Sequence, residues 1–223
     1  MSTVWGNFVY QLLETRHEEA AIDVLCSVFS AQEPLAKALA TQPDELRPFV
    51  SDLVRHATEG GLSWVAIEEK SARLAGVRIL TDTHRDFIPA DYPSSKVKTI
   101  FSFLHSLYDD ESESMMTAAA PPLLHCWMVA VLPAFQRQGV LRNLYRTGGE
   151  WATRCGFIYG IEEVTNRHNL AFLNNETDVT VLKSLDYADY KFHGAYPFRN
   201  AEESQYCALC RYPLIRQEAR PPV

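Results

Sequence analysis

The stretch VAVLPAFQRQGVL, residues 129–141, leads out of an apolar run of strand character at 123–132 and into a segment of helical length at 139–155. A second apolar run follows at 157–164, so these segments predict a βαβ unit. Free backbone N–H groups at the start of a helix, aided by the helix dipole, can hold a pyrophosphate without a cluster of basic side chains. The stretch therefore predicts either an anion site, with room for the ligand at Gly139, or a plain turn.

The rest of the chain predicts helices and strands in mixed order. Apolar spacing predicts further strands at 7–14, 62–68, 73–81 and 205–212. It also predicts helices at 16–29, 35–40, 44–58, 94–108 and 175–185. Pro34 disfavours the helical conformation at the residue before it, so Glu33 should lie on a turn, whereas the acidic run 109–114 predicts a solvated loop. With no repeat or linker in view, the pattern predicts one α/β (α+β) domain over residues 1–223 with a single sheet.

The composition narrows the class of partner. The chain has 223 residues, of which 47% are hydrophobic, and a formal net charge of -7. This charge disfavours nucleic acid, which requires clustered Lys and Arg, and weakly favours a cationic ligand such as an amine. No run approaches the roughly 18 apolar residues of a membrane span, so no membrane partner is expected.

The cysteines predict reduced thiols rather than a disulfide framework, because their number is odd and most lie in apolar segments. They are Cys26, Cys126, Cys155, Cys207 and Cys210. A cytoplasmic location follows as the expectation. Cys207 and Cys210 form a CxxC pair without a second ligand pair, so we expect a structural role for them and no metal site. Cys126 and Cys155 are expected to be buried thiols.

Residues 136–141 resemble the pyrophosphate loop of the GCN5-related N-acetyltransferase (GNAT) family, which reads Gln or Arg, two residues, Gly, one residue, then Gly or Ala. Leu141 stands where the family has a small residue, and the preceding strand with Pro133 also matches. The resemblance implies a mixed, mostly antiparallel central sheet flanked by helices and splayed beside Val129 to Val131. It also implies acetyl-CoA as the donor, held by Val129, Val131, Gln136, Arg137, Gln138, Gly139, Val140, Leu141 and Arg142.

A second block, residues 175–187, resembles the family's next helix. That helix carries an Asn and, seven residues later, the Tyr that protonates the departing CoA thiolate. Asn175 fits the first position and is implied to bind the cofactor, whereas Leu182 stands at the position of the Tyr. Tyr187 and Tyr190 lie nearby in the sequence, either as substitutes for this Tyr or as core aromatics.

A third block points to one branch of the family. Glu33-Pro34-Leu35 resembles the Asp-Glu-Pro-Leu segment of the insect-type arylalkylamine N-acetyltransferases, whose Glu is the general base, so the resemblance implies that role for Glu33. The vertebrate-type enzymes have two histidines one residue apart in the central strand as proton acceptors. His125 matches the first and Trp127 replaces the second. Strand alternation predicts that His125, Trp127 and Val129 share one face.

The resemblance implies an enzyme that moves an acetyl group from acetyl-CoA directly to a small primary amine, an arylalkylamine or a polyamine, without a metal and as a monomer or homodimer. Two alternatives stay open. The first is an acyltransferase with another acyl donor or with a peptide or antibiotic amine as acceptor. The second is a noncatalytic acyl-CoA-binding protein, which the departures at Leu141 and Leu182 favour.

Overall fold

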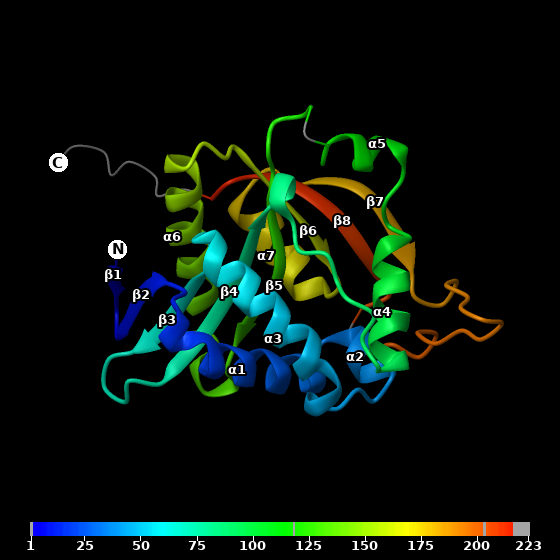
Figure 1. Cartoon of the computed structure of the whole chain (residues 1–223), viewed down its shortest axis with the longest axis horizontal. Helices are drawn as coiled ribbons and strands as arrows, with labels where there is room; N and C mark the ends of the chain where they lie inside the picture. Colours follow the sequence, from blue (N-terminus) through cyan, green and yellow to red (C-terminus); the bar gives the residue numbers. More distant parts are fainter. Residues whose placement is uncertain (1, 118, 203, 216–223) are drawn as a thin grey trace.

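The computed structural model describes residues 2–117, 119–202 and 204–215 and is organised around one eight-stranded sheet (Figure 1). The strands are β1 (Ser2–Trp5), β2 (Phe8–Leu12), β3 (Trp64–Glu68), β4 (Leu74–Asp82), β5 (Leu124–Val131), β6 (Tyr159–Val164), β7 (Thr180–Asp186) and β8 (Tyr206–Pro213). They lie in the order β1-β2-β3-β4-β5-β6-β8-β7. Only the β5–β6 pair is parallel among these strands, which confirms the predicted mixed, mostly antiparallel sheet.

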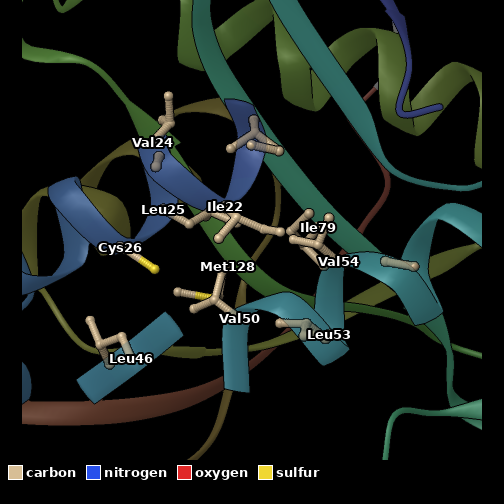
Figure 2. Packing of buried hydrophobic residues seen from close by; sticks show 14 of the residues in the cluster. Ile22, Val24, Leu25, Cys26, Leu46, Val50, Leu53, Val54, Ile79 and Met128 are labelled. Atoms are coloured by element: carbon tan, nitrogen blue, oxygen red, sulfur yellow. The ribbon is translucent and has the colours of Figure 1, made fainter. Parts of the chain in front are cut away.

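Helices cover both faces of this sheet. They are α1 (Glu18–Gln32), α2 (Pro34–Ala38), α3 (Pro43–Gly60), α4 (Ser95–His105), α5 (Asp110–Ser114), α6 (Val140–Arg154) and α7 (Arg167–Glu176). On one face, apolar side chains of α1 and α3 meet Ile79 of β4 and Met128 of β5 (Figure 2). On the other face, Leu144 and Ala152 of α6 pack against Trp64 of β3. Two hydrophobic layers therefore enclose the sheet and fix the position of β5 between them.

An extra residue in β5 changes which side chains share a face. Ile79 of β4 pairs with Met128, but the next residue, Leu80, pairs with Cys126, so Trp127 has no partner in the register. His125 and Trp127 lie together, with ring centroids 4.7 Å apart. Val129 instead packs against the cluster on the α6 face. The prediction that all three share a face is therefore wrong for Val129, because a β-bulge shifts the alternation by one residue.

The sheet splays open between its two central parallel strands. The register between β5 and β6 contains only the pairs Leu124–Gly160 and His125–Ile161 in the described chain. From Cys126 onward, β5 has lost its neighbour on that side and the two strands diverge. This confirms the splay predicted beside Val129 to Val131, and it leaves backbone groups of β5 without a strand partner on the β6 side.

The segment 175–185 was wrongly predicted as a helix. The helix in this region is α7, which begins earlier, with the Asn166 side chain accepting a hydrogen bond from the Asn169 N–H as its N-cap. Residues 180–186 form β7 and pair with β8. Hydrogen bonding to the edge of an existing sheet outweighed a helical spacing of only a few apolar residues.

Two smaller expectations also fail. The acidic run 109–114 contains the short helix α5, because the Asp109 side chain accepts from the Ser112 N–H and caps it. The sequence also gave no sign of β1, which pairs with β2 across a turn at Gly6 with a positive φ of 59°. The remaining predicted helices and strands occur within a few residues of their expected ends.

Gly76 of β4 lies too close to β5 to carry a side chain. A Cβ atom at this position would lie 2.9 Å from the carbonyl oxygen of Ala130 and 3.1 Å from the Val140 side chain. We expect Gly76→Ala to lower the free energy of unfolding by about 1–3 kcal/mol, because a strand carbonyl cannot retreat without moving β5. Urea titration followed by circular dichroism measures this change.

Gly60→Ala is the matched control, because a Cβ atom there would meet nothing within 4 Å. It should leave the stability unchanged or raise it by up to about 1 kcal/mol. An equal loss in the two variants would contradict the close contact between β4 and β5.

Candidate active site

A cavity of about 1660 Å³ occupies the region where the sheet splays. Its lining combines the start of α6, the diverging part of β5, the start of α7, the α1–α2 corner and one side of α4. The predicted site residues that line it are Glu33, His125, Val129, Val131, Gln136, Arg137, Gly139, Val140, Leu141 and Arg142. Gln138 and Asn175 lie outside this lining. One continuous space thus joins three segments that are far apart in the sequence.

The start of α6 presents backbone N–H groups to this cavity. Gly139 is the N-cap residue, with a left-handed φ of 80° and no side chain that caps the helix. Arg137 also has a positive φ, of 59°. The Gln136 side chain donates to the carbonyl of Val131 at 3.1 Å and to the Gln32 side chain at 3.0 Å. This arrangement leaves the first turn of the helix open to an anion.

The two arginines near this helix start differ in their surroundings. Arg142 forms an ion pair with Glu176 of α7 at 2.5 Å, whereas Arg137 has no ion pair with any residue in the described ranges. Leu141 packs against the apolar cluster that includes Leu173. Its larger side chain is thus accommodated against α7. Glu176 also pairs with Arg146 at 3.6 Å, so this group of three keeps one net positive charge, which adds to Arg137 and the helix dipole at this end of the cavity.

Glu33 occupies the corner between α1 and α2 in an extended conformation, as the following proline predicted. One carboxyl oxygen accepts from the Ala36 N–H at 2.6 Å and caps α2. The other, Oε1, is buried and has no hydrogen-bond partner among the described residues. Burial raises the pKa of Glu33, and the backbone N–H groups of Ala36 and Leu35 offset this only in part, together with the nearby Thr165 side chain, whose hydroxyl makes no hydrogen bond with Oε1.

His125 is held between two carboxylates. Its side chain is only 3% exposed, with Nδ1 2.7 Å from an Asp86 oxygen and Nε2 3.2 Å from a Glu163 oxygen. Asp86 also accepts from the Trp127 indole at 2.7 Å and from the Thr81 hydroxyl at 2.6 Å. On the far side, the Tyr108 hydroxyl donates to Glu163. Side chains from four segments therefore form one hydrogen-bonded chain along the cavity wall.

The charged groups in this hydrogen-bonded series shift one another's pKa values toward the charged forms. Burial lowers the pKa of His125, but the charge of Glu163 and the hydrogen bonds to both carboxylates outweigh it and raise the pKa to about 10. Burial likewise raises the pKa of Asp86 and Glu163, and the attraction of His125 more than offsets this, so both values are lowered. At neutral pH, His125 is an imidazolium that donates from both nitrogens and has no lone pair to accept a proton.

The residues of the second block lie away from the cavity. Asn175 is exposed near the end of α7, and Leu182 belongs to β7. The Tyr187 hydroxyl donates to the carbonyl of Thr165, and the Tyr190 hydroxyl donates to Ser102 at 2.9 Å. Because the helix that the resemblance required is absent from 175–185, its spacing does not identify a proton donor.

Several residues that the fold brings into the site were not predicted from the sequence. Asp86, Tyr108 and Thr165 come from segments without a recognisable motif. Glu163 could have been noticed, because it follows Glu162 inside an otherwise apolar strand, where two acids require partners. Thr165 continues β6 to the Asn166 cap of α7.

The cysteines are free thiols without a shared site. Cys126, Cys207 and Cys210 are buried, whereas Cys155 is exposed at the end of α6, which corrects the expectation that it is buried. None of the described residues gather into a group of three or more His, Cys, Asp and Glu side chains able to hold a metal ion. The described helices include none with the length and apolar character to span a membrane.

Comparison with known proteins finds similarity in structure alone. No family model and no curated protein sequence matches the chain. The C-terminal condensation domain of Ebony, solved with beta-alanyl-dopamine, matches with a TM-score of 0.79 and 16% identity, over 96% of this chain and 100% of that one. Arylalkylamine N-acetyltransferase 2 of Aedes aegypti matches with a TM-score of 0.78 and 16% identity, over 94% and 100%.

A third match is the Drosophila melanogaster polyamine N-acetyltransferase that forms N-acetylagmatine. Its TM-score is 0.71 at 15% identity, over 93% of this chain and 99% of that one. Together the matches show that this protein has the GNAT fold, near that of the arylalkylamine N-acetyltransferases. At these identities the likeness establishes the fold and carries no activity across.

The charge on His125 predicts a pH dependence of stability. Its unfolded pKa is about 6.5, so above that pH the folded protein keeps a proton that the unfolded chain loses. The contribution is complete below pH 6.5 and is lost as the pH rises toward the folded value of about 10. We expect the free energy of unfolding to fall by up to about 1.4 kcal/mol per pH unit between roughly pH 6.5 and 8.

Urea titrations across this range compare the wild type with His125→Asn, which removes the titrating group. The variant should be less stable at every pH, because two buried carboxylates lose their partner. A wild-type stability that does not change between pH 6.5 and 8 would show that His125 is not charged in the folded state.

Proposed function

We propose that this protein is an acetyl-CoA-dependent N-acetyltransferase that moves the acetyl group directly to a small primary amine. One observation carries the proposal. The cavity connects an open helix start, suited to a pyrophosphate, with the buried and unpartnered carboxyl oxygen of Glu33. The diverging edge of β5 lies between the two and offers backbone groups to the pantetheine arm. We also propose a cytoplasmic location, because free cysteines are typical of proteins in a reducing compartment.

The donor end is suited to CoA without a basic cluster. The pyrophosphate would lie against the N–H groups of Val140 and Leu141, where Gly139 has no side chain to obstruct it. Arg137 would add one positive charge. Gln136, which joins the loop to Val131 and Gln32, would hold the loop at the mouth of the cavity. Donor binding thus falls to the backbone and a few side chains.

Glu33 is the proposed general base. An amine is protonated in water and cannot attack until a proton leaves its nitrogen, and a carboxylate with a raised pKa is suited to take it. The amine then attacks the thioester carbonyl, and an N–H on the free edge of β5 stabilises the oxyanion. The carbon–sulfur bond breaks as the amide forms. The substrate ammonium loses two protons in all, one of which ends on the CoA thiol and one in solvent.

His125 is assigned an electrostatic role rather than that of a base. As an imidazolium between Asp86 and Glu163, it leaves the group of three with one net negative charge on the cavity wall. That charge favours a cationic acceptor, and the neighbouring Trp127 and Phe87 rings favour one with an apolar part. The fold relatives named for arylalkylamines and agmatine are consistent with such an acceptor.

A different acyl donor is the second candidate. The Ebony domain in complex with beta-alanyl-dopamine favours it, because the beta-alanyl group is a larger acyl group than acetyl. A panel of acetyl-CoA, longer acyl-CoAs and aminoacyl thioesters, each offered with the same amine, separates the two candidates by relative kcat/KM. A noncatalytic role has lost part of its support, since Leu182 belongs to a strand and Leu141 packs into the core.

Calorimetric titration with acetyl-CoA tests the donor site. The wild type should bind, and Gly139→Glu should weaken binding by about tenfold or more, because a carboxylate would face the phosphates at the helix start. Gly61→Glu is the matched control. Gly61 also has a left-handed φ, of 65°, at a helix end with open space around it, and it does not line the cavity.

Gly61→Glu introduces the same backbone strain and the same added charge away from the cavity. The control therefore shows whether a loss of binding depends on where the charge lies. Retained binding in Gly61→Glu together with loss in Gly139→Glu supports the proposed loop. A folded wild-type protein that binds no acyl-CoA would overturn the proposed function.

Glu33→Gln tests the base. A glutamine keeps an oxygen to accept from the Ala36 N–H, so the cap of α2 is preserved while the charge is lost. We expect turnover, followed as released CoA thiol with a panel of arylalkylamines and polyamines, to fall about 10²–10⁴-fold. The Kd for acetyl-CoA should change by less than about twofold, since the phosphate loop is bound by the Gln32 side chain, whereas the Glu33 carboxyl bonds the Ala36 N–H of α2.

Asp109→Asn is the control for this variant. Asp109 also caps a short helix with its carboxylate, but it does not line the cavity. Its turnover should equal that of the wild type. Undiminished turnover in Glu33→Gln would remove Glu33 from the mechanism.

A further inference from the structure

A group of buried polar side chains begins where the backbone pairing of β5 and β6 ends. The last registered pair is His125–Ile161, and the next residue on each strand is Cys126 and Glu162. Both side chains line the cavity and both point to the α6 face of the sheet. On that face they meet Arg78 of β4, which is 1% exposed. Side-chain contacts thus replace the ladder at the position where it stops.

The contacts run across the gap from one side to the other. Arg78 donates to the Cys126 sulfur at 3.4 Å and to the Tyr212 hydroxyl at 2.8 Å. The Tyr212 hydroxyl donates in turn to Glu162 at 2.8 Å. The Tyr145 hydroxyl also donates to Glu162, at 2.9 Å, and its ring lies 3.6 Å from the Arg78 guanidinium carbon. We call these five residues the brace. It connects β4 and β5 on one side with β6 and β8 on the other.

Gly160 of β6 makes room for the brace. A Cβ atom at this position would lie 2.7–2.9 Å from the ring and hydroxyl of Tyr212. The Tyr212 ring can therefore lie over β6, near the end of the β5–β6 pairing, only because residue 160 has no side chain.

A simple role in stability does not account for this group. Burying an arginine and a glutamate costs desolvation free energy, and apolar residues of similar volume often serve a core as well or better. Glu162 is 4% exposed and sits among two tyrosines, an arginine and a thiol, where an apolar cluster would otherwise continue. Hydrogen bonds have defined lengths and angles, which apolar contacts lack. The polar side chains can therefore fix the separation of two strands that have no backbone ladder.

We propose that the brace is a positioning device that sets the width of the gap between β5 and β6, and thereby the site of the pantetheine arm. This inference rests on the proposed function, since it concerns the same donor. None of the five residues needs to take part in the chemistry. The brace acts on the arm of CoA and not on its phosphates, which bind at the start of α6.

Tyr212→Phe tests the proposal, because it removes the hydroxyl that links Arg78 to Glu162 and keeps the ring. Tyr206→Phe on the same strand is the control, since Tyr206 is 39% exposed and does not line the cavity. Each protein is titrated with CoA and with 3′,5′-ADP, which has phosphates but no pantetheine arm. We expect Tyr212→Phe to raise the Kd for CoA about tenfold, the effect of one lost hydrogen bond, and to leave that for 3′,5′-ADP within about twofold.

The ratio of the two Kd values separates positioning from general loss of structure, which would weaken both ligands. Arg78→Met alone would leave Glu162 buried without a nearby cation, so the second variant is the pair Arg78→Met with Glu162→Met, which removes both ionisable side chains. A selective rise for CoA in this folded variant also supports the brace. An unchanged ratio in both variants would overturn it, whereas a wild type that binds neither ligand would overturn the proposed function itself.

Discussion

The loss of the backbone ladder between β5 and β6 is the constraint on which the rest of the structure depends. A parallel pair that stops after His125 and Ile161 leaves polar backbone groups facing a cavity instead of a neighbouring strand. The bulge at Trp127 lies in the same part of β5, where it shifts the following side chains by one position. A buried strand can be left in this state only if other elements hold it, and α1, α3 and α6 do so from both faces.

Ionisable side chains are buried on both faces of the sheet at the point where the β5–β6 pairing ends. Glu162 and Glu163 are adjacent in β6, so their side chains point to opposite faces. On the α6 face, Glu162 accepts from the hydroxyls of Tyr145 and Tyr212, and Tyr212 accepts from Arg78, whereas on the other face Glu163 contacts His125 and Tyr108. Glu163 therefore pairs with a cation directly, and Glu162 is joined to one through a tyrosine hydroxyl, so each buried acid has hydrogen-bond partners. At the end of the β5–β6 pairing, the α6 face of the sheet lies beside the proposed site of the pantetheine arm. The opposite face lies beside the proposed site of the acceptor amine.

The sequence allowed the fold to be predicted to the extent that its signals were local. The strand–loop–helix around Gly139 and the turn at Glu33 follow from apolar runs, a glycine and a proline, and the structure has both. The error at 175–185 arose because an edge strand is decided by its partner, here β8, whose paired residues lie twenty or more positions further along the chain. The site residues were hard to predict for the same reason, because their roles depend on residues distant in the sequence. Asp86 and Glu163 acquire their importance from His125, and only the folded sheet brings the three together.

Glu33 shows why the proposed base occupies a helix corner. Its Oε2 atom is fixed by the Ala36 N–H, so the carboxylate cannot rotate freely, and its Oε1 atom is left buried without a partner. An unsatisfied buried acceptor costs about 1–3 kcal/mol in most settings, and this one lies in the lining of the cavity. A base that awaits a proton must keep an oxygen free. The same desolvation that makes the atom costly also raises its affinity for that proton. The cap gives the carboxylate its orientation, and the empty hydrogen-bonding position of Oε1 is available to the amine.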